Sequence, residues 1–211
     1  MNNNDYKLKI ILLAAGKSER FNDIKLLAKV KQQDGSITLI EHALQQIYKA
    51  LNILNLNENN LHVATGCYHP QLAQLIGNRY SLSYCENAHL GLGHTIAQSV
   101  EKILNNEEST SHIMITLADQ VALNFEDYVS LIKQSLATPD KLICAKAGQE
   151  IMPPAIFSQV YFNDLMTLKG DKGAKALLHR NKENLQEVLL SNAAIDIDTQ
   201  QELINWYKSN R

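Results

Sequence analysis

Four polar side chains suited to binding phosphate follow the first apolar segment of the chain. Residues 10–15 read Ile-Ile-Leu-Leu-Ala-Ala, and the polar loop behind them carries Lys17, Ser18, Arg20 and Lys25. Successive backbone N–H groups around Gly16 can form a concave anion site, because glycine lets a ligand approach the backbone closely. Arginine binds phosphate oxygens with a bidentate fork, and lysine binds them as a point charge. The spacing therefore predicts that Arg20 and Lys25 neutralise a triphosphate.

Single positions argue against two other phosphate-binding loops. The run Gly16-Lys17-Ser18 looks like the end of a P-loop, but that motif needs a glycine five residues before Gly16, where Ile11 stands. The run Gly91-Leu92-Gly93 begins a dinucleotide fingerprint, yet Ile96 occupies the position of the third small residue. The first loop must therefore bind phosphate in another way.

Carboxylates that could hold a metal ion occur in two further segments. Asp119 follows the apolar run Ile113-Met114-Ile115, and at the end of a strand it can bind Mg²⁺ while phosphate oxygens complete the octahedron. The alternative for Asp119 is a turn or cap residue. Asp196 and Asp198 alternate along an expected strand and so point to one side of it. Either can be the second metal ligand, and Asp198 can instead support the first turn of the last helix.

Two other kinds of site are disfavoured, and one histidine stays open. The available zinc ligands, Cys67, His69, Cys85 and His89, match no spacing of a structural zinc site. Ser18 lies outside the G-x-S-x-G pattern of a serine-hydrolase elbow. His94 stands at an expected helix start, where a histidine is more often an exposed loop residue than an acid–base catalyst.

Composition restricts the class of protein. The chain has 211 residues, of which 45% are hydrophobic and 20% charged, with a net charge of −2 and three widely separated cysteines. These values are typical of a soluble globular protein without a disulfide framework, and they argue against a nucleic-acid surface. No apolar run approaches the roughly 18 residues that a membrane span needs. The N-terminal residues lack the basic and apolar parts of a signal peptide, so we expect a cytoplasmic protein.

The elements that must position these residues alternate between strands and helices. Strands are expected near 8–14, 61–65, 80–85, 112–118 and 140–146. Between them, apolar residues recur at helical spacing over 40–51 and 96–104, and Asn124 can cap a helix with Asp127. Such β-α-β alternation predicts a mostly parallel sheet covered by helices on both faces, with the ligand beyond the carboxyl ends of the strands.

The pattern changes after residue 146. The adjacent prolines Pro153-Pro154 are followed by an expected helix around 158–168 and then by the glycine-rich loop Gly170-Asp171-Lys172-Gly173. We expect strands near 185–189 and 193–197, and a terminal helix that Thr199 and Glu202 begin with a capping box.

The phosphate loop also resembles the signature of a known family. Eight residues fall in register with the L-A-A-G-x-S-x-R-M-G-x-x-K-x-L signature of MobA-like NTP transferases, namely Leu13, Ala14, Ala15, Gly16, Ser18, Arg20, Lys25 and Leu27. Phe21-Asn22 replaces the Met-Gly pair, and asparagine tolerates positive φ better than most residues. The resemblance runs from residue 8 to about 205. It includes the segments 87–95, 117–120, 170–175 and 196–203.

The resemblance implies a fold and a set of site residues. The expected fold is a three-layer α/β/α, Rossmann-like nucleotidyltransferase fold with a mostly parallel mixed sheet. It forms a single domain over 1–211, with a nucleotide-binding part of about 8–125 and an acceptor-binding part of about 140–211. The implied catalytic residues are Arg20, Lys25 and Asp119, and the implied metal ligands are Asp119 and Asp196. The nucleotide would contact Leu13, Ala14, Ala15, Gly16, Ser18, Asn87, Gly91 and Thr95. The acceptor would contact Gly170, Asp171, Gly173 and Lys175.

The same resemblance implies an activity. The chain is most similar to molybdenum cofactor cytidylyltransferases, which implies Mg²⁺-dependent transfer of a nucleotidyl group from CTP, or another NTP, to a phosphorylated small molecule such as molybdopterin, with release of pyrophosphate. Neither a nucleic acid nor a membrane is an expected partner. The alternatives are a sugar- or alditol-phosphate nucleotidyltransferase and a non-catalytic nucleotide-binding regulator or chaperone, which the Phe21-Asn22 and Lys175 departures keep open.

Overall fold

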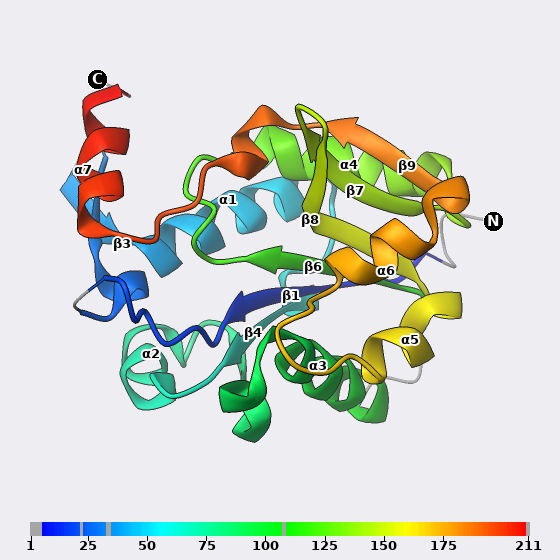
Figure 1. The fold of residues 1–211 in the computed structure, drawn as a ribbon, viewed down its shortest axis with the longest axis horizontal. Helices are drawn as coiled ribbons and strands as arrows, with labels where there is room; N and C mark the ends of the chain where they lie inside the picture. The colour runs from blue at the N-terminus through cyan, green and yellow to red at the C-terminus, as the bar shows by residue number, and fades with distance from the viewer. Residues whose placement is uncertain (1–5, 22, 33–34, 107–108, 210–211) are drawn as a thin grey trace.

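A seven-stranded sheet forms the centre of the molecule (Figure 1). The structure is a computed structural model that describes residues 6–21, 23–32, 35–106 and 109–209. Asn22, at the departure from the family signature, lies outside these ranges. The strand order is β5-β4-β1-β6-β8-β7-β9. The strands are β1 (Leu8–Ala14), β4 (Leu61–Thr65), β5 (Ser81–Tyr84), β6 (His112–Leu117), β7 (Leu142–Ala147), β8 (Glu150–Ser158) and β9 (Leu185–Leu189).

The sheet is mixed but mostly parallel, as predicted. Strand β1 pairs in parallel with β4 and β6, β4 with β5, and β7 with β9, whereas β8 is antiparallel to β6 and β7. In the register, Leu13 lies opposite Ala64 on one side and Leu117 on the other. The carboxyl ends of β1, β4 and β6 therefore meet at one edge, which is where ligands bind in such sheets.

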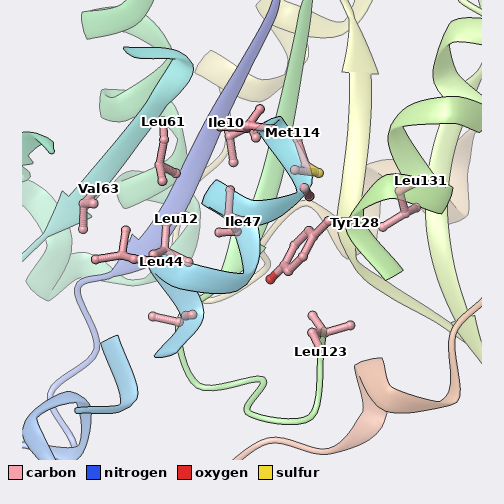
Figure 2. Packing of buried hydrophobic residues seen from close by; sticks show 14 of the residues in the cluster. Ile10, Leu12, Leu44, Ile47, Leu61, Val63, Met114, Leu123, Tyr128 and Leu131 are labelled. Carbon is pink, nitrogen blue, oxygen red and sulfur yellow. The ribbon is translucent and has the colours of Figure 1, made fainter. Parts of the chain in front are cut away.

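Helices cover both faces of this sheet and bury two hydrophobic cores. On one face lie α1 (Leu39–Ile53), α2 (His69–Ile76) and α4 (Phe125–Ala137). On the other lie α3 (Leu92–Asn106), α5 (Phe162–Met166) and α6 (Lys175–Arg180). Figure 2 shows the first core, where Ile10 and Leu12 of β1 meet Leu44 and Ile47 of α1. The three-layer α/β/α prediction is confirmed.

Local sequence signals start α1 and α4 on the first face. Thr38 and Glu41 form a capping box at α1, and Asn124 and Asp127 form the predicted one at α4. Each box satisfies two backbone N–H groups that a helix start leaves unpaired. In α1 the buried apolar residues recur at helical spacing, so one face of the helix packs on the sheet. No helix within the described ranges is both long and apolar enough to cross a membrane.

A third, smaller core joins distant segments beside the main sheet. Phe21, Val121, Ile197 and Leu203 are buried together, with Val30 and Leu39. Around this core lie the β2–β3 hairpin (Lys29–Gln32 and Gly35–Thr38) and α7 (Gln200–Ser209), which are neighbours in Figure 1. The predicted capping box at Thr199 and Glu202 is present at the start of α7.

The predicted strand near 193–197 is wrong. A 3₁₀ helix spans Ser191–Ala194, and residues 195–198 form an irregular segment. Other groups satisfy its backbone: the Gln120 side chain donates to the Ala193 carbonyl, and the Ile197 N–H donates to the Asp119 carbonyl. A segment whose backbone is bonded in this way needs no neighbouring strand.

Strand β8 was not predicted, because it contains Pro153 and Pro154. Proline has no N–H for the ladder and is confined to edges and irregular positions of a sheet. Here the β7–β8 register shifts, since Cys144 lies opposite Ala155 whereas Ala145 lies opposite Met152. Both prolines fall inside that irregularity. The strand therefore accommodates them without losing regular pairs.

Candidate functional site

A cleft of about 630 Å³ opens beyond the carboxyl ends of β1 and β6. Leu13 of β1 and Leu117, the last residue of β6, line it. The phosphate loop forms one wall, and the turn before α3 forms another. The remaining wall residues come from far along the chain. The loop and strand residues lining the cleft are Ala15, Gly16, Lys17, Ser18, Glu19, Arg20 and Lys25; the others are Ala88, His89, Gly91, Leu92, Thr95, Asp119, Asp171 and Asp198.

Hydrogen bonds within the phosphate loop and from a neighbouring turn support its conformation. Ser18 has a φ of 55°, in the left-handed region that is uncommon outside glycine. Its carbonyl accepts from the Phe21 N–H (3.0 Å), and its Oγ accepts from the Lys25 N–H (3.1 Å). The Tyr68 hydroxyl donates to the Lys17 carbonyl (2.8 Å). These bonds join Ser18 to Phe21 and Lys25 and attach Lys17 to the turn after β4.

Lys25 lies between two carboxylates at the centre of the site. Its Nζ is 2.7 Å from Asp119 Oδ2 and 3.0 Å from Asp198 Oδ1. Asp198 also pairs with Arg20. The Lys25 side chain is 12% exposed and that of Arg20 72% exposed. Two cations and two carboxylates therefore neutralise each other where the sequence predicts phosphate binding.

The electrostatics follow from this arrangement. Partial burial acts to lower the pKa of Lys25, but the adjacent carboxylates of Asp119 and Asp198 outweigh it and raise the pKa above its ordinary value. Partial desolvation, with the negative charges of the same two aspartates, raises the pKa of the Asp196 carboxyl. Asp196 is therefore close enough for those charges to act on it, although the residue as a whole is exposed to solvent.

Backbone bonds connect the two carboxylates that come from distant segments. The carbonyl of Asp119 accepts from the Ile197 N–H (3.0 Å), which places Asp198 beside it. Buried Gln120 donates to the carbonyls of Pro153 (2.8 Å) and Ala193 (2.7 Å). The Asp119-Gln120 pair thus attaches the segment 193–198 to the end of β6. The Gln120 side chain has a structural role that the sequence alone does not reveal.

The turn before α3 packs against the glycine-rich loop 169–173. The Gly93 N–H donates to the Gly170 carbonyl (2.7 Å), and a Cβ on Gly91 would meet the Gly170 backbone at 2.5 Å. A Cβ on Gly93 would meet the Lys169 backbone at 2.8 Å. Only glycine permits such close approach of two backbones. The predicted nucleotide and acceptor segments are therefore in direct contact.

The cleft contains most of the predicted site residues. Those of the phosphate loop, Gly91, Thr95, Asp119 and Asp171 line it, while Ala14 is buried in β1 behind it. Among the described residues, Asn87, Gly170, Gly173, Lys175 and Asp196 lie outside the lining. Asn87 is exposed, and Lys175 pairs with Glu150 (2.7 Å). Gly173 is buried against Leu92. The functional roles of all these residues stay predictions.

The family resemblance leaves several residues of the site without a role. Lys17, one of the side chains suited to binding phosphate, and Glu19 line the cleft, and both lie inside the signature loop. The sequence offers Asp196 and Asp198 as alternatives for the second metal ligand, and Asp198 is the one that lines the cleft. Gly66 had no signal, yet a Cβ there would lie 2.7 Å from the Ala15 carbonyl oxygen. Its role depends on a close approach that only the fold creates.

The carboxylates suit a divalent ion that is shared with phosphate. Asp119 Oδ1 is buried and has no hydrogen-bond partner in the part of the chain that the structure describes. The described residues contain no group of three or more histidine, cysteine, aspartate or glutamate side chains placed to hold a metal. Mg²⁺ commonly binds through one or two carboxylates, with water and substrate phosphates as the other ligands. Asp119 and Asp198 fit that mode rather than an all-protein site.

Several solved structures share this fold. Rv0371c from Mycobacterium tuberculosis H37Rv superposes with a TM-score of 0.75 at 16% identity, covering 96% of this chain and 98% of that one. A complex of Rv0371c with manganese superposes at 0.74. The 4-diphosphocytidyl-2C-methyl-D-erythritol synthase of Anaerococcus prevotii superposes at 0.72 with 11% identity, covering 97% and 99%. The fold is the Rossmann-like fold of nucleotidyltransferases.

Sequence comparison identifies the family within this class. The model of the MobA-like NTP transferase domain matches residues 10–186. The chain is 31% identical over 196 residues to the purine catabolism protein PucB of Bacillus subtilis (strain 168), covering 91% of this chain and 92% of PucB. The protein therefore belongs to the MobA-like NTP transferase family, as the signature around Gly16 predicts.

Proposed function

We propose that this protein transfers a cytidylyl group from CTP to a phosphorylated small molecule such as molybdopterin and releases pyrophosphate. The position of Lys25 is the observation that carries the proposal. Its Nζ lies 2.7 Å from Asp119 in a cleft that also contains Arg20 and the backbone around Gly16. A preorganised cation beside a carboxylate suits a reaction in which charge develops on phosphate oxygens.

The chain's own residues can supply the main requirements of the reaction. A phosphate oxygen of the acceptor attacks the α-phosphorus in line, a new P–O bond forms, and the bond to pyrophosphate breaks, so no covalent enzyme intermediate is needed. Lys25 and Arg20 exchange their carboxylate partners for phosphate oxygens and stabilise the charge on the leaving pyrophosphate. Asp119 and Asp198 would hold a divalent ion such as Mg²⁺, which when bound offsets further phosphate charge.

The choice of CTP and Mg²⁺ is supported by similarity. The signature resembles that of cytidylyltransferases, and the synthase from Anaerococcus prevotii is named for a diphosphocytidyl product. A complex of Rv0371c with manganese supports a divalent ion in this fold. Residues 15–20 would then surround the triphosphate, and the loop 169–173 would face the acceptor.

A nucleotide panel followed by a product assay tests the proposal. We expect CTP with MgCl₂ to raise the melting temperature more than GTP, ATP or UTP do, since a ligand at a hundred times its dissociation constant adds about 2.7 kcal/mol. Molybdopterin should then support pyrophosphate release. A shift with GTP and none with CTP would overturn the cytidylyl assignment. Nucleotide binding without pyrophosphate release in the presence of any phosphorylated acceptor would favour a non-catalytic nucleotide-binding protein.

The first prediction concerns Asp119. Asp119→Asn keeps the shape of the side chain but removes the charge that a divalent ion needs, so the rate of pyrophosphate release should fall roughly a hundredfold or more. The melting temperature should change little, because the amide can still accept from Lys25. Asp164→Asn, an exposed acid in α5, is the matched control. If Asp119→Asn unfolds while keeping its activity per folded molecule, Asp119 is structural.

A further inference from the structure

His94 connects two segments of the cleft that come from opposite halves of the chain. It lies in the first turn of α3, beside the cleft-lining residue Thr95, and is itself outside the lining. The backbone N–H of Gly170 lies 3.0 Å from His94 Nδ1. The carbonyl of Gly170 accepts from the Gly93 N–H at 2.7 Å. Both polar backbone groups of Gly170 are thus bonded to the start of one helix.

The hydrogen bond from the Gly170 N–H requires His94 Nδ1 as its acceptor. A backbone N–H can only donate, so His94 Nδ1 must be unprotonated to accept from it, and the ring proton is then on Nε2. His94 Nδ1 also lies 3.2 Å from the carbonyl of Leu90. A ring protonated at Nδ1 would donate to Leu90 and lose Gly170. The bond to the loop therefore requires the tautomer with its proton on Nε2.

The loop that His94 holds carries a charged group into the cleft. Asp171 follows Gly170 and lines the cleft wall. Its Oδ1 lies 2.6 Å from the point where a Cβ on Gly91 would be, so the carboxylate rests directly over the nucleotide turn. Gly170 has a φ of 61°, which lets the chain turn back at this point. Fixing Gly170 fixes the direction from which Asp171 enters the cleft.

We infer that His94 is a positioning residue for the acceptor. Its unprotonated Nδ1 holds the loop 169–173 against the nucleotide turn. This contact places the Asp171 carboxylate at the acceptor side of the cleft. The inference rests on the proposed function for its catalytic consequence. A carboxylate there accepts hydrogen bonds from N–H or O–H groups of an acceptor and repels the acceptor's phosphate. The phosphate is thereby directed toward Lys25 and Arg20, whose charge attracts it.

Hydrogen exchange and kinetics with two substitutions test the role. His94→Ala removes the acceptor atom, whereas His94→Asn places an oxygen near the position of Nδ1. We expect amide exchange in 169–173 to rise about tenfold in His94→Ala and to return near the wild-type rate in His94→Asn. With molybdopterin as the probe, kcat/KM for the acceptor should follow the same order. The dissociation constant of CTP with Mg²⁺ should change less than about twofold.

A control variant and an NMR measurement on the wild-type protein complete the test. His179→Ala, an exposed histidine in α6, should change neither exchange nor kinetics. In the wild-type protein, the ¹⁵N shift of His94 Nδ1 should be that of an unprotonated nitrogen, which decides the point even if His94→Ala fails to fold. A protonated Nδ1, unchanged exchange in folded His94→Ala, or a parallel loss of CTP affinity would overturn the inference. If the wild-type protein releases no pyrophosphate with molybdopterin, the proposed acceptor fails, and exchange and tautomer still decide the role of His94.

Discussion

In the free protein, the carboxylates of Asp119 and Asp198 balance the positive charges of Lys25 and Arg20. Asp198 contacts both cations, and Asp119 contacts Lys25. A triphosphate that approaches alone meets two carboxylates, and a divalent ion that approaches alone meets two cations. A bound divalent ion should therefore lower the electrostatic cost of binding the triphosphate, and a bound triphosphate that of binding the ion. We expect each ligand to raise the affinity for the other.

Asp196 and Asp198 should differ in how strongly they contribute to Mg²⁺ binding. Asp198 lines the cleft and pairs with Lys25, whereas Asp196 is exposed beside it. Asp198→Asn should raise the Mg²⁺ concentration for half-maximal pyrophosphate release about tenfold or more, and Asp196→Asn less than about twofold. A titration of each variant with MgCl₂ measures this. The reverse order would restore Asp196 as the metal ligand.

The raised pKa of Lys25 gives a prediction for alkaline pH. Because the folded state binds this proton more tightly than the unfolded chain, the stabilisation is complete below the ordinary pKa of 10.5 and is lost as pH rises through the folded value. Lys25→Met should lower the free energy of unfolding by about 1 kcal/mol at pH 7. That difference from wild type should shrink above pH 10.5 in urea titrations. A difference that stays constant through this range would show that packing, not charge, supplies it.

The sequence predicted side chains whose chemistry is local and missed those whose role depends on folding. Lys25 and Asp119 each follow an apolar strand within a recognisable motif, and the structure brings them together in the cleft. The choice between Asp196 and Asp198 depended on a strand that does not form. In the irregular segment, the Ile197 N–H bonds to the Asp119 carbonyl and Asp198 is the carboxylate beside Lys25.

Gly16 and Gly66 lie near the end of β1 and have different roles there. A Cβ on Gly16 would meet nothing within 4 Å, so the free protein has room for a side chain there. A Cβ on Gly66, in the turn after β4, would lie 2.7 Å from the Ala15 carbonyl oxygen. We infer that Gly16 is required by the ligand and Gly66 by the packing of two strand ends.

Alanine substitution at each glycine tests this distinction. Gly16→Ala should leave the free energy of unfolding unchanged or raise it by less than about 1 kcal/mol, because alanine restricts the unfolded chain. Its affinity for CTP should fall about tenfold, because a methyl group would stand where phosphate approaches the backbone. Gly66→Ala should lower stability by about 1–3 kcal/mol, since backbone must move. Thermal unfolding and calorimetric CTP titration measure both effects, and equal affinity for CTP in Gly16→Ala and wild type would remove Gly16 from the site.

Elements with strong periodicity were predictable, and those stabilised by tertiary contacts were not. The strand prediction at 61–65 coincides with β4, and the capping box at Asn124 is present. Strand β8 was missed because Pro153 and Pro154 argue against a strand, and only its pairing with β6 and β7 shows how they are accommodated. Such pairing between distant strands leaves no local signal in the sequence.

The third core connects α7 to the segments that form the site. Leu203 is 8% exposed and packs with Phe21 of the phosphate loop and Ile197, the neighbour of Asp198. Leu203→Ala should lower the free energy of unfolding by about 2–3 kcal/mol and weaken Mg²⁺-dependent CTP binding, because it loosens the segment that places Asp198. Ile204→Ala, at a side chain 45% exposed, should cost less than about 1 kcal/mol and leave binding intact. Destabilisation with unchanged CTP binding would separate the core from the site.

The contact between Arg20 and Asp198 also bears on how the protein is made. These residues are 178 positions apart, and ribosomes add about 5–20 residues per second, so roughly 10–40 seconds separate the synthesis of the two side chains. In the first part of that interval a nascent chain has Arg20 and Lys25 but neither Asp119 nor Asp198, and Asp198 is the last of these four residues to be made. The basic loop of an unfinished chain therefore lacks the carboxylates that pair with it in the folded protein, and the cleft is complete only after the segment around Asp198 has emerged.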